Sequence, residues 1–438
     1  MSSPDCIASN SSTLSLPADE DEEPQFIGNG LILEGLSGKT ENLWDYDEGG
    51  HLPVHLEDCL GDDKQYRVLL KLGNGGYANV WLCRVLDRHP TEYVALKILM
   101  ADASGEDCPE LQIVSRLQDL TREMPSLAEH LCLPLDQFRM DGPNGSHLCL
   151  VYPLAGPEVC PINKMVDNPD HLLRSIARQA AEAMAALHRA GICHGDFRPP
   201  NILLRANYNG MSEDEILEYF EHPFTARVVT HSGEQSTDPR APAYLVYPVE
   251  YGSRSDDRAS DQICVIDFGE SYKISNPPGD LGIPLPYTAP EVVFDKKCGP
   301  PSDIWALACT LLEIRTGSPL FSLFDDDKDE YLFNVVQTFG PFPEPWWSTS
   351  WEQRRTIFPD EPRSPSTREL RTLRRVLSRV VVCAPKPTPS GEDEFVYIPE
   401  EEQKVFADLL EKMFQYDIEK RLSAEEVLQH PWFSMEFN

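Results

Sequence analysis

Apolar and polar positions follow two different patterns along the chain, and the change from one to the other divides it into sections. Short runs rich in branched and aromatic residues, bounded by glycine or polar residues, are typical of strands. Such runs cover residues 66–72, 80–83, 93–98 and 147–152, and the last follows a turn signal, Gly142-Pro143-Asn144-Gly145. The sequence therefore predicts a β-rich section in which order begins near residue 66 and whose last strand closes a hairpin.

Helical spacing dominates from residue 169 onwards. Apolar residues recur on one face from 169 to about 190, and Gly191 follows as a stop signal. That face carries Leu172, Leu173, Ile176, Ala180, Met184 and Leu187. Residues 302–321 are apolar nearly all round, which indicates a buried helix, and two further helices are predicted at 401–415 and 423–430. The two patterns together favour an α+β chain with a small β-rich part and a larger helical part.

A polar stretch precedes the β-rich section. Residues 1–62 are rich in Ser, Asp and Glu, and we expect them to form a largely disordered acidic tail, above all over roughly the first twenty residues. Residues 43–46 contain an aromatic pair, Trp44 and Tyr46. This pair either anchors the tail on the folded body or stays unpacked, and the sequence leaves both interpretations open.

Two more polar stretches interrupt the helical part, at about 205–262 and 341–400. The first contains a predicted helix over 213–220, with Ser212 as N-cap and Glu215 completing a capping box. The rest of this detour is rich in Pro, Ser and Asp, and we interpret it as an inserted spacer.

The chain of 438 residues carries a formal net charge of −34, which argues against direct binding of DNA or RNA through phosphate contacts. Such a surface suits basic protein partners, although acidity that only maintains solubility is an equal alternative on charge alone. The twelve cysteines form no C-x-x-C pair, which favours reduced thiols over a disulfide framework or a zinc site. With no secretory signal and no apolar run near ~20 residues, we expect a monomeric protein of the cytoplasm, the nucleus or both, away from membranes.

Two stretches carry chemistry. Asp196 and Asn201 lie five residues apart in a loop after the helix that ends near 190, and Asp267 follows a short apolar strand, 263–266. A carboxylate at Asp196 suits proton acceptance from an attacking hydroxyl. The Asn201 amide oxygen and the Asp267 carboxylate suit Mg²⁺ ligands. These groups at this spacing are typical of phosphoryl transfer.

Four further features belong to the same chemistry. A glycine-rich loop, Gly73-Asn74-Gly75-Gly76, links two predicted strands and would let backbone amides close over phosphates. Lys97 stands in an otherwise uncharged strand, which favours phosphate binding over a surface role. Glu110, on a predicted helix at 110–117, is the natural partner to hold Lys97, although a solvated helix carboxylate remains the alternative. Residues 153–156 suggest a hinge, where adenine would meet the Pro153 carbonyl and the Ala155 amide.

These motifs, in this order, resemble a eukaryotic protein kinase from about residue 66 to 433. The long detour between Asn201 and Asp267, the 142–145 turn and residues 80–82 resemble the SR-protein kinase group, in particular its divergent fungal members. The resemblance implies a two-lobed kinase fold, with an N-lobe at 63–155 and a C-lobe at 156–438 that contains both inserts. Members of that group phosphorylate serines in Arg/Ser-rich protein segments, usually of splicing factors.

The resemblance also implies roles for individual residues. Asp196 takes the substrate proton, Lys97 contacts the α- and β-phosphates of ATP, and Arg198 places charge near the γ-phosphate. Asn201 and Asp267 hold Mg²⁺. The remaining nucleotide-binding positions are Leu72, Gly73, Asn74, Gly75, Gly76, Val80, Ala95, Glu110, Pro153 and Ala155. Two structural contacts are implied as well: Glu291 with Arg421, and Asp303 with backbone amides of the catalytic loop.

Parts of the sequence are compatible with two other functions. Two departures from the kinase pattern slightly favour a pseudokinase or acidic scaffold. Arg198 replaces the usual lysine, and Ala78 replaces the third glycine of the usual kinase loop. All the groups that the chemistry needs are nevertheless present. A small-molecule kinase is disfavoured because Ala289-Pro290-Glu291 and the helix that begins near Asp303 are typical of kinases that act on proteins.

Gly195 replaces the arginine that normally precedes the catalytic aspartate, so the basic partner of an activation-loop phosphate is missing. We therefore predict a kinase that does not require activation-loop phosphorylation, and whose turnover survives phosphatase treatment; abolished turnover would refute this. No threonine stands three residues before Tyr287, where Ser/Thr kinases commonly have one, so the expected serine preference rests on the group alone.

Overall fold

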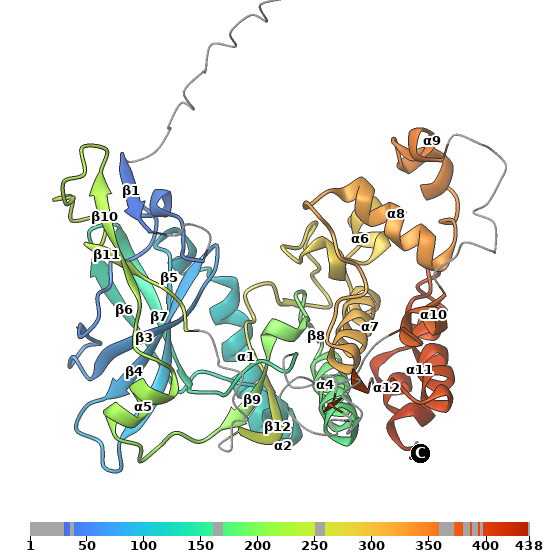
Figure 1. The fold of residues 1–438 in the computed structure, drawn as a ribbon, viewed down its shortest axis with the longest axis horizontal. Coiled ribbons are helices and arrows are strands. Elements are labelled where there is room, and N and C mark those ends of the chain that lie inside the picture. Colours follow the sequence, from blue (N-terminus) through green and yellow to red (C-terminus); the bar gives the residue numbers. More distant parts are fainter. Residues whose placement is uncertain are drawn as a thin grey trace, which may run out of the picture.

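An antiparallel sheet forms the β-rich half of the protein in the computed structural model (Figure 1). Its strand order is β2-β3-β4-β5-β7-β6. The strands are β2 Cys59–Leu60, β3 Tyr66–Asn74, β4 Ala78–Val85, β5 Glu92–Leu99, β6 Asp136–Gly142 and β7 Gly145–Pro153. The structure describes residues 30–35, 39–160, 170–249, 259–358, 372–379, 386–387, 393–394 and 397–436. The predicted strands and the β6–β7 hairpin are confirmed.

Helices form the other half, and α1 Pro109–Glu123 and α2 Pro125–His130 lie between it and the sheet. The predicted amphipathic helix is α4 Asp170–Arg189, which packs against the almost fully buried α7 Pro300–Thr316. The sequence prediction extended α7 to residue 321. The helix ends at Thr316 because Gly317 adopts a left-handed conformation with φ of 70° and caps it.

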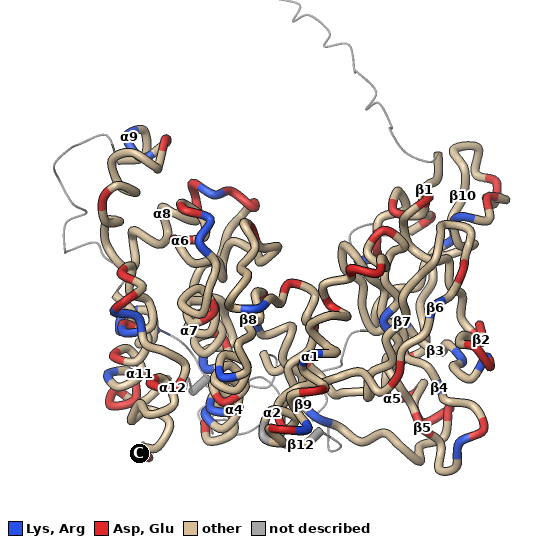
Figure 2. The backbone as a smooth tube through the Cα atoms, turned by 180° about the vertical axis from the view of Figure 1, so that it is seen from behind, with Lys and Arg blue, Asp and Glu red and all other residues tan. Residues whose placement is uncertain are grey.

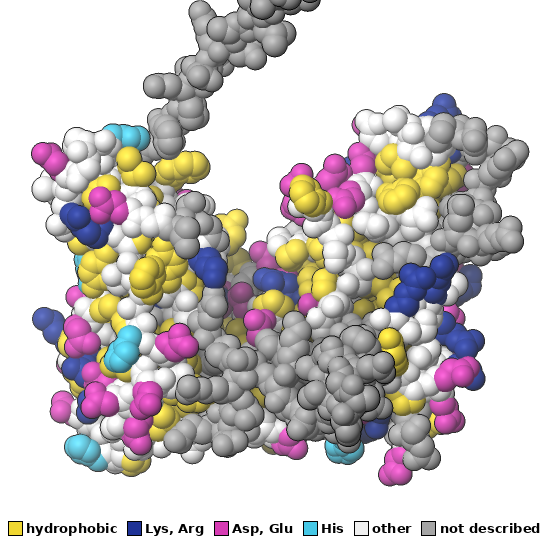
Figure 3. All heavy atoms as spheres, viewed as in Figure 1, with side chains coloured by type: hydrophobic (Ala, Val, Ile, Leu, Met, Phe, Trp, Pro, Cys, Tyr) yellow, Lys and Arg dark blue, Asp and Glu magenta, His cyan; other side chains and the backbone are white. Residues whose placement is uncertain are grey.

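Shorter elements complete the helical lobe. These are α6 Pro290–Asp295, α8 Lys328–Phe339, α9 Arg354–Ile357, α10 Leu373–Leu377, α11 Glu400–Met413 and α12 Ala424–Leu428. Two short two-stranded antiparallel sheets belong to this half: β8 Ile192–Cys193 pairs with β13 Tyr272–Lys273, and β9 Ile202–Ala206 pairs with β12 Ala259–Val265. The molecule has the predicted two-lobed α+β architecture, and Figure 3 shows the hollow between the lobes. No helix in the described part of the chain is long and apolar enough to cross a membrane.

The N-terminal stretch differs from its prediction. Residues 1–29 lie outside the described part, but β1 Leu31–Glu34 and a 3-10 helix at Leu43–Asp45 pack on the β-rich lobe, so order begins well before residue 66. Tyr46 is 2% exposed and anchors the segment, whereas Trp44 is 60% exposed. The polar composition concealed this packing because the segment buries charged groups against partners on the sheet.

The 205–262 detour also differs from its prediction, because it forms a helix and strands that pack on the sheet and is not a spacer. Its helix is confirmed as α5 Glu213–Tyr219, with the Ser212–Glu215 capping box in place. Two strands follow, β10 Thr225–Thr230 and β11 Tyr244–Val246, and β10 pairs with both β1 and β11. The detour leaves the C-lobe at β9 and returns at β12, yet it packs on the N-lobe: Ile216 and Phe220 bury themselves against Leu69, Leu70 and Leu82 of the sheet. Apolar residues thinly spaced among polar ones carry this packing.

Candidate functional site

A partly buried lysine joins the two lobes. Lys97 Nζ lies 2.7 Å from Glu110 Oε1 on α1 and 2.9 Å from Asp267 Oδ1, which follows β12 in the other lobe. The predicted contact between Lys97 and Glu110 is confirmed. Burial would lower the pKa of Lys97, but the two carboxylates outweigh it and raise the pKa well above its ordinary value. Burial would raise the pKa of Asp267, yet Lys97 and the Gly269 amide hold it below the usual range. Both groups are therefore charged at neutral pH.

A tyrosine that sequence reasoning missed supports this ion pair. Tyr152, near the end of β7, is buried and donates its hydroxyl to Glu110 Oε1 at 3.3 Å. Its neighbour across the sheet is Ala95. Because side chains alternate along strands, a residue opposite Ala95 shares the face that carries Lys97. That alternation was the available signal for Tyr152.

Hydrogen bonds to Asp303 on α7 hold the loop that carries Asp196. Asp303 accepts hydrogen bonds from the amides of His194 at 2.9 Å and Gly195 at 3.0 Å, which confirms the predicted contact. The Asn201 side-chain amide donates to Asp196 Oδ2 at 2.8 Å. The Asn201 carbonyl accepts from the amide of Ile266 at 2.9 Å, immediately before Asp267. The structure thus brings the two predicted metal-binding residues and Asp196 into one hydrogen-bonded neighbourhood.

Arg198 contacts Asp196 directly. Its Nε atom lies 3.0 Å from both carboxylate oxygens. Burial raises the pKa of Asp196 above its ordinary value, and Arg198 opposes this shift without cancelling it. The carboxylate is therefore a stronger proton acceptor than an exposed aspartate.

Asp267 adopts a backbone conformation that non-glycine residues rarely take, with φ of 61°. Strained conformations of this kind cluster at functional sites because the surrounding structure must hold them. Here the contacts from Lys97 and Gly269 do so. The carboxylate of Asp267 and the amide oxygen of Asn201 are hard oxygen donors, so the residues present fit a magnesium ion.

The nucleotide-covering loop joins β3 and β4. A Cβ added at Gly73 or Gly76 would meet nothing within 4 Å, so the loop leaves open space beside it. Val80 pairs with Lys97 across the sheet, while Leu72 packs in the cluster that also contains the hinge residue Leu154.

An apolar cluster borders the same site. It contains the predicted Ala95 and Ala155, together with Tyr152, Leu203 and Ile266. Leu203 and Ile266 were not predicted as site residues. Their positions, just after Asn201 and just before Asp267, could have indicated that they lie at the site. Pro153 pairs with Val94 at the end of the sheet, so the predicted hinge lies where the lobes join.

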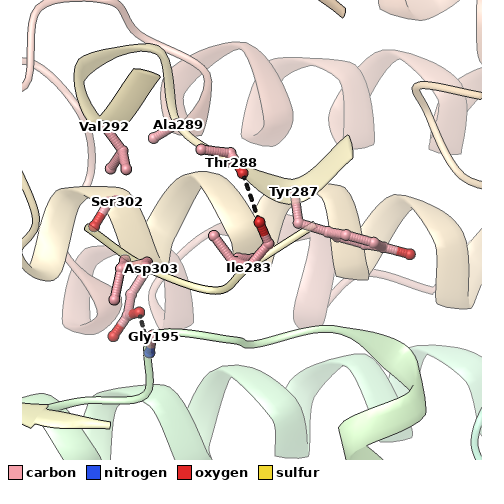
Figure 4. A pocket seen from close by; sticks show the side chains of 9 residues that line it. Gly195, Ile283, Tyr287, Thr288, Ala289, Val292, Ser302 and Asp303 are labelled. Carbon is pink, nitrogen blue, oxygen red and sulfur yellow. Dashed lines mark hydrogen bonds between the residues drawn. The ribbon is translucent and has the colours of Figure 1, made fainter. Parts of the chain in front are cut away.

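The segment after Asp267 is tied to the catalytic loop. Gly195 has φ of 82°, and a Cβ there would approach the Glu270 carbonyl oxygen to 2.2 Å. Glu270 in turn accepts a hydrogen bond from the Gly282 amide at 2.8 Å. A small pocket lies beside this contact, and Figure 4 shows the Gly195 amide facing Asp303 within it. Its lining is Gly195, Leu281, Ile283, Tyr287, Thr288, Ala289, Val292, Ser302 and Asp303. The arginine usual at position 195 would not fit this backbone.

The predicted bridge in the large lobe is confirmed. Arg421 donates to Glu291 Oε1 at 2.6 Å and to Oε2 at 2.9 Å, with both side chains buried. The Arg421 guanidinium also lies over the Trp305 ring, 5.3 Å from its centroid. This bridge links the start of α6 to the stretch before α12 and so braces the segment that follows the site.

Comparison with known proteins agrees with this geometry. A family model described as protein kinase domain matches residues 255–433. The chain is a protein kinase. It is 24% identical to serine/threonine-protein kinase SRPK of Physarum polycephalum, over 91% of this chain and 92% of the relative. It is 28% identical to serine/threonine-protein kinase AFC3 of Arabidopsis thaliana, over 89% and 87%. It is 26% identical to dual specificity protein kinase CLK2 of Mus musculus, over 89% and 67%. The kinase is therefore SR-protein kinase-like and of the serine/threonine class, and ATP binding follows from its family.

Gly195→Ala should lower the stability and turnover of the kinase more than alanine at another glycine with a similar positive φ. Gly191 has φ of 76° with nothing within 4 Å of an added Cβ, so Gly191→Ala isolates the conformational cost, about 1–2 kcal/mol. Gly195→Ala adds a clash with a backbone carbonyl, and we expect a further ~1–3 kcal/mol of destabilisation with reduced turnover. Urea unfolding and peptide phosphorylation of both variants measure this difference. Equal losses would contradict the packing at Gly195.

Proposed function

We propose that this kinase transfers the γ-phosphate of ATP, with Mg²⁺, to serine in basic, Arg/Ser-rich protein segments. The observation that carries the proposal is the complete charge arrangement around the cleft: Lys97 held by Glu110 and Asp267 on one side, and Asp196 held by Asn201 and Arg198 on the other. A pseudokinase that had lost turnover would not need all of these groups.

Each residue then has a role in the reaction. Lys97 binds the α- and β-phosphates and the glycine-rich loop closes over them, which excludes water. Asp196 orients the substrate hydroxyl and accepts its proton, while Arg198 places positive charge near the transferred phosphoryl group. Asn201 and Asp267 would hold magnesium. When bound, this ion neutralises charge that develops on the phosphate oxygens.

Two carboxylates near Arg198 support a basic substrate. Glu158 forms an isolated bridge with Leu203, beside the catalytic loop, and Glu313 lies on α7. Burial raises the pKa of each, Glu158 adds to the shift of Glu313, and Arg198 opposes both shifts. Glu313 also accepts a hydrogen bond from the Tyr287 hydroxyl at 2.5 Å, and the ion pair of Arg198 is with Asp196. The two carboxylates therefore keep acceptor oxygens for a guanidinium, which a substrate arginine would supply.

The overall charge agrees with this substrate class. Asp and Glu residues are spread over both lobes (Figure 2), and the net charge of −34 attracts basic protein while it repels nucleic acid. We propose, from the resemblance alone, that serine is preferred, that the kinase acts as a monomer and that it works in the cytoplasm or nucleus.

Asp196→Asn should abolish phosphate transfer while leaving nucleotide binding intact, because it removes the proton acceptor and keeps the shape of the side chain. We expect turnover of an Arg-Ser repeat peptide to fall by at least about 100-fold, the scale of general-base catalysis. Radiolabel transfer from ATP measures it, and titration with a fluorescent ATP analogue measures binding. Asp214→Asn, on the exposed face of α5, is the matched control. A wild-type kinase without transfer to any basic serine peptide would overturn the proposal.

The acidic side of the pH profile should depend on Arg198. Activity requires ionised Asp196, so kcat/KM falls as pH drops through the pKa of that carboxyl, which burial raises. Arg198 lowers this pKa, so Arg198→Met should raise it and move the fall in kcat/KM to higher pH. Arg198→Lys keeps a positive charge and should move it less. The measurement is kcat/KM against pH for wild type, Arg198→Met and Arg198→Lys. If the fall at acidic pH occurred at the same pH in Arg198→Met as in wild type, the role given to Arg198 would be contradicted.

A further inference from the structure

A segment before the β-rich lobe lies against both ends of the glycine-rich loop. Residues 39–46, here called the clamp segment, cross the sheet where β3 ends and β4 begins. Asn74 is the last residue of β3 and pairs with Asn79 on β4, so this pair closes the base of the loop. The clamp segment contacts both residues.

The contacts converge on Glu41. The Asn74 side-chain amide faces the Lys39 carbonyl oxygen at 3.2 Å and the Glu41 backbone amide at 3.3 Å. Asn79 donates to Glu41 Oε1 at 3.4 Å, and Tyr46 donates its hydroxyl to the same atom at 2.6 Å. Lys71 on β3 forms an ion pair with Glu41 Oε2. One carboxylate thus receives donors from the clamp segment, β3 and β4.

This carboxylate is held in a dry environment. Glu41 is 7% exposed and Lys71 is fully buried, with its Nζ 5.4 Å from the centre of the Trp81 ring. Burial lowers the pKa of Lys71, and Glu41 opposes that shift. Buried ion pairs contribute less to net stability than to a unique geometry, since removing one partner leaves the other unpaired in the interior. The geometry fixed here is the position of the loop base.

The loop itself has few restraints of its own. Tyr77 at its tip is 71% exposed. One backbone hydrogen bond crosses the loop, from the Gly75 amide to the Ala78 carbonyl oxygen at 2.9 Å, and one holds it from outside, from the Met100 amide to the Tyr77 carbonyl oxygen at 2.8 Å. The position of the loop over a nucleotide therefore depends strongly on how its two ends are held.

The clamp segment acts from the face of the sheet opposite the nucleotide. Lys71 pairs with Trp81, and Trp81 with Leu96, in a cluster on one face. Lys97 follows Leu96 and so lies on the other face. A change at Glu41 therefore removes no direct contact with ATP.

The chain just beyond the clamp segment is anchored on the rest of the N-lobe. The Gly49 amide donates to the Asn144 carbonyl oxygen at 2.8 Å, and Asn144 Nδ2 donates to the His51 carbonyl oxygen at 2.7 Å. The same Asn144 group donates to the Arg240 carbonyl oxygen, at 2.8 Å, in the detour. The clamp segment is thus followed directly by a stretch, residues 49–51, that is held to the β6–β7 turn, which also contacts the detour.

We propose that residues 39–46 position the glycine-rich loop for ATP, with Glu41 as the principal positioning residue and Asn74 as its link to the loop. This inference rests on the proposed function insofar as the loop covers ATP. It assigns a role in nucleotide binding to a segment that precedes the kinase motifs.

The test compares Glu41→Gln and Tyr46→Phe with wild type, and with Glu48→Gln, an exposed glutamate just beyond the clamp segment, as the matched control. We expect KM for ATP to rise about three- to tenfold in both variants, the scale of one lost hydrogen bond to a charged group. KM for the peptide should stay within twofold, and Glu48→Gln should match wild type. A fluorescent ATP analogue should show the same loss of affinity without turnover.

A purely structural role would lower the melting temperature and the fraction of active enzyme without separating the two KM values. Tyr46→Phe leaves the Glu41–Lys71 pair intact, so it decides the matter if Glu41→Gln does not fold. Unchanged ATP affinity in these folded variants would overturn the inference, while wild-type turnover would leave the proposed function standing. If the wild-type protein bound no Mg–ATP, that result would contradict the proposed function itself and not only this inference.

Discussion

A lysine ammonium held between two carboxylates is the interaction on which the site depends. Lys97 comes from the sheet, Glu110 from α1 and Asp267 from the other lobe, so one cation joins three separate elements. Charges withdrawn from water require partners with good geometry. The triad has one more negative charge than positive, and a site with this imbalance favours a further cation. That requirement agrees with magnesium beside Asp267.

In the C-lobe a buried carboxylate, Asp303, also holds separate parts of the chain together. Asp303 gathers the His194 and Gly195 amides and so fixes the loop that carries Asp196. Side chains rather than regular secondary structure hold that loop, which is why its backbone can place Asp196, Arg198 and Asn201 together. The left-handed conformations of Gly195 and Asp267 belong to the same tight packing.

Sequence patterns predicted the parts of the fold that rest on local signals. The strands of the N-lobe, α4, the α5 capping box and the Lys97–Glu110 pair were predicted from motifs or periodicity, whereas the Glu291–Arg421 pair was implied by the resemblance to protein kinases. The packing of the clamp segment and the detour was not, because it depends on long-range contacts between polar-looking stretches. Glu41 resembles a solvated tail residue until Lys71 is placed beside it. Tyr152 escaped notice because its hydroxyl partner, Glu110, lies 42 residues away.

The central claim is that the Lys97 triad forms a magnesium-dependent phosphate-binding centre. Calorimetric titration of the folded protein with ATP, with and without magnesium, tests it most directly when wild type is compared with Lys97→Met. The account predicts magnesium-dependent binding by wild type and a loss of at least about tenfold in affinity in the variant, the scale of a lost charge-assisted contact. Equal affinity in the two proteins, or no magnesium-dependent binding by wild type, would contradict it.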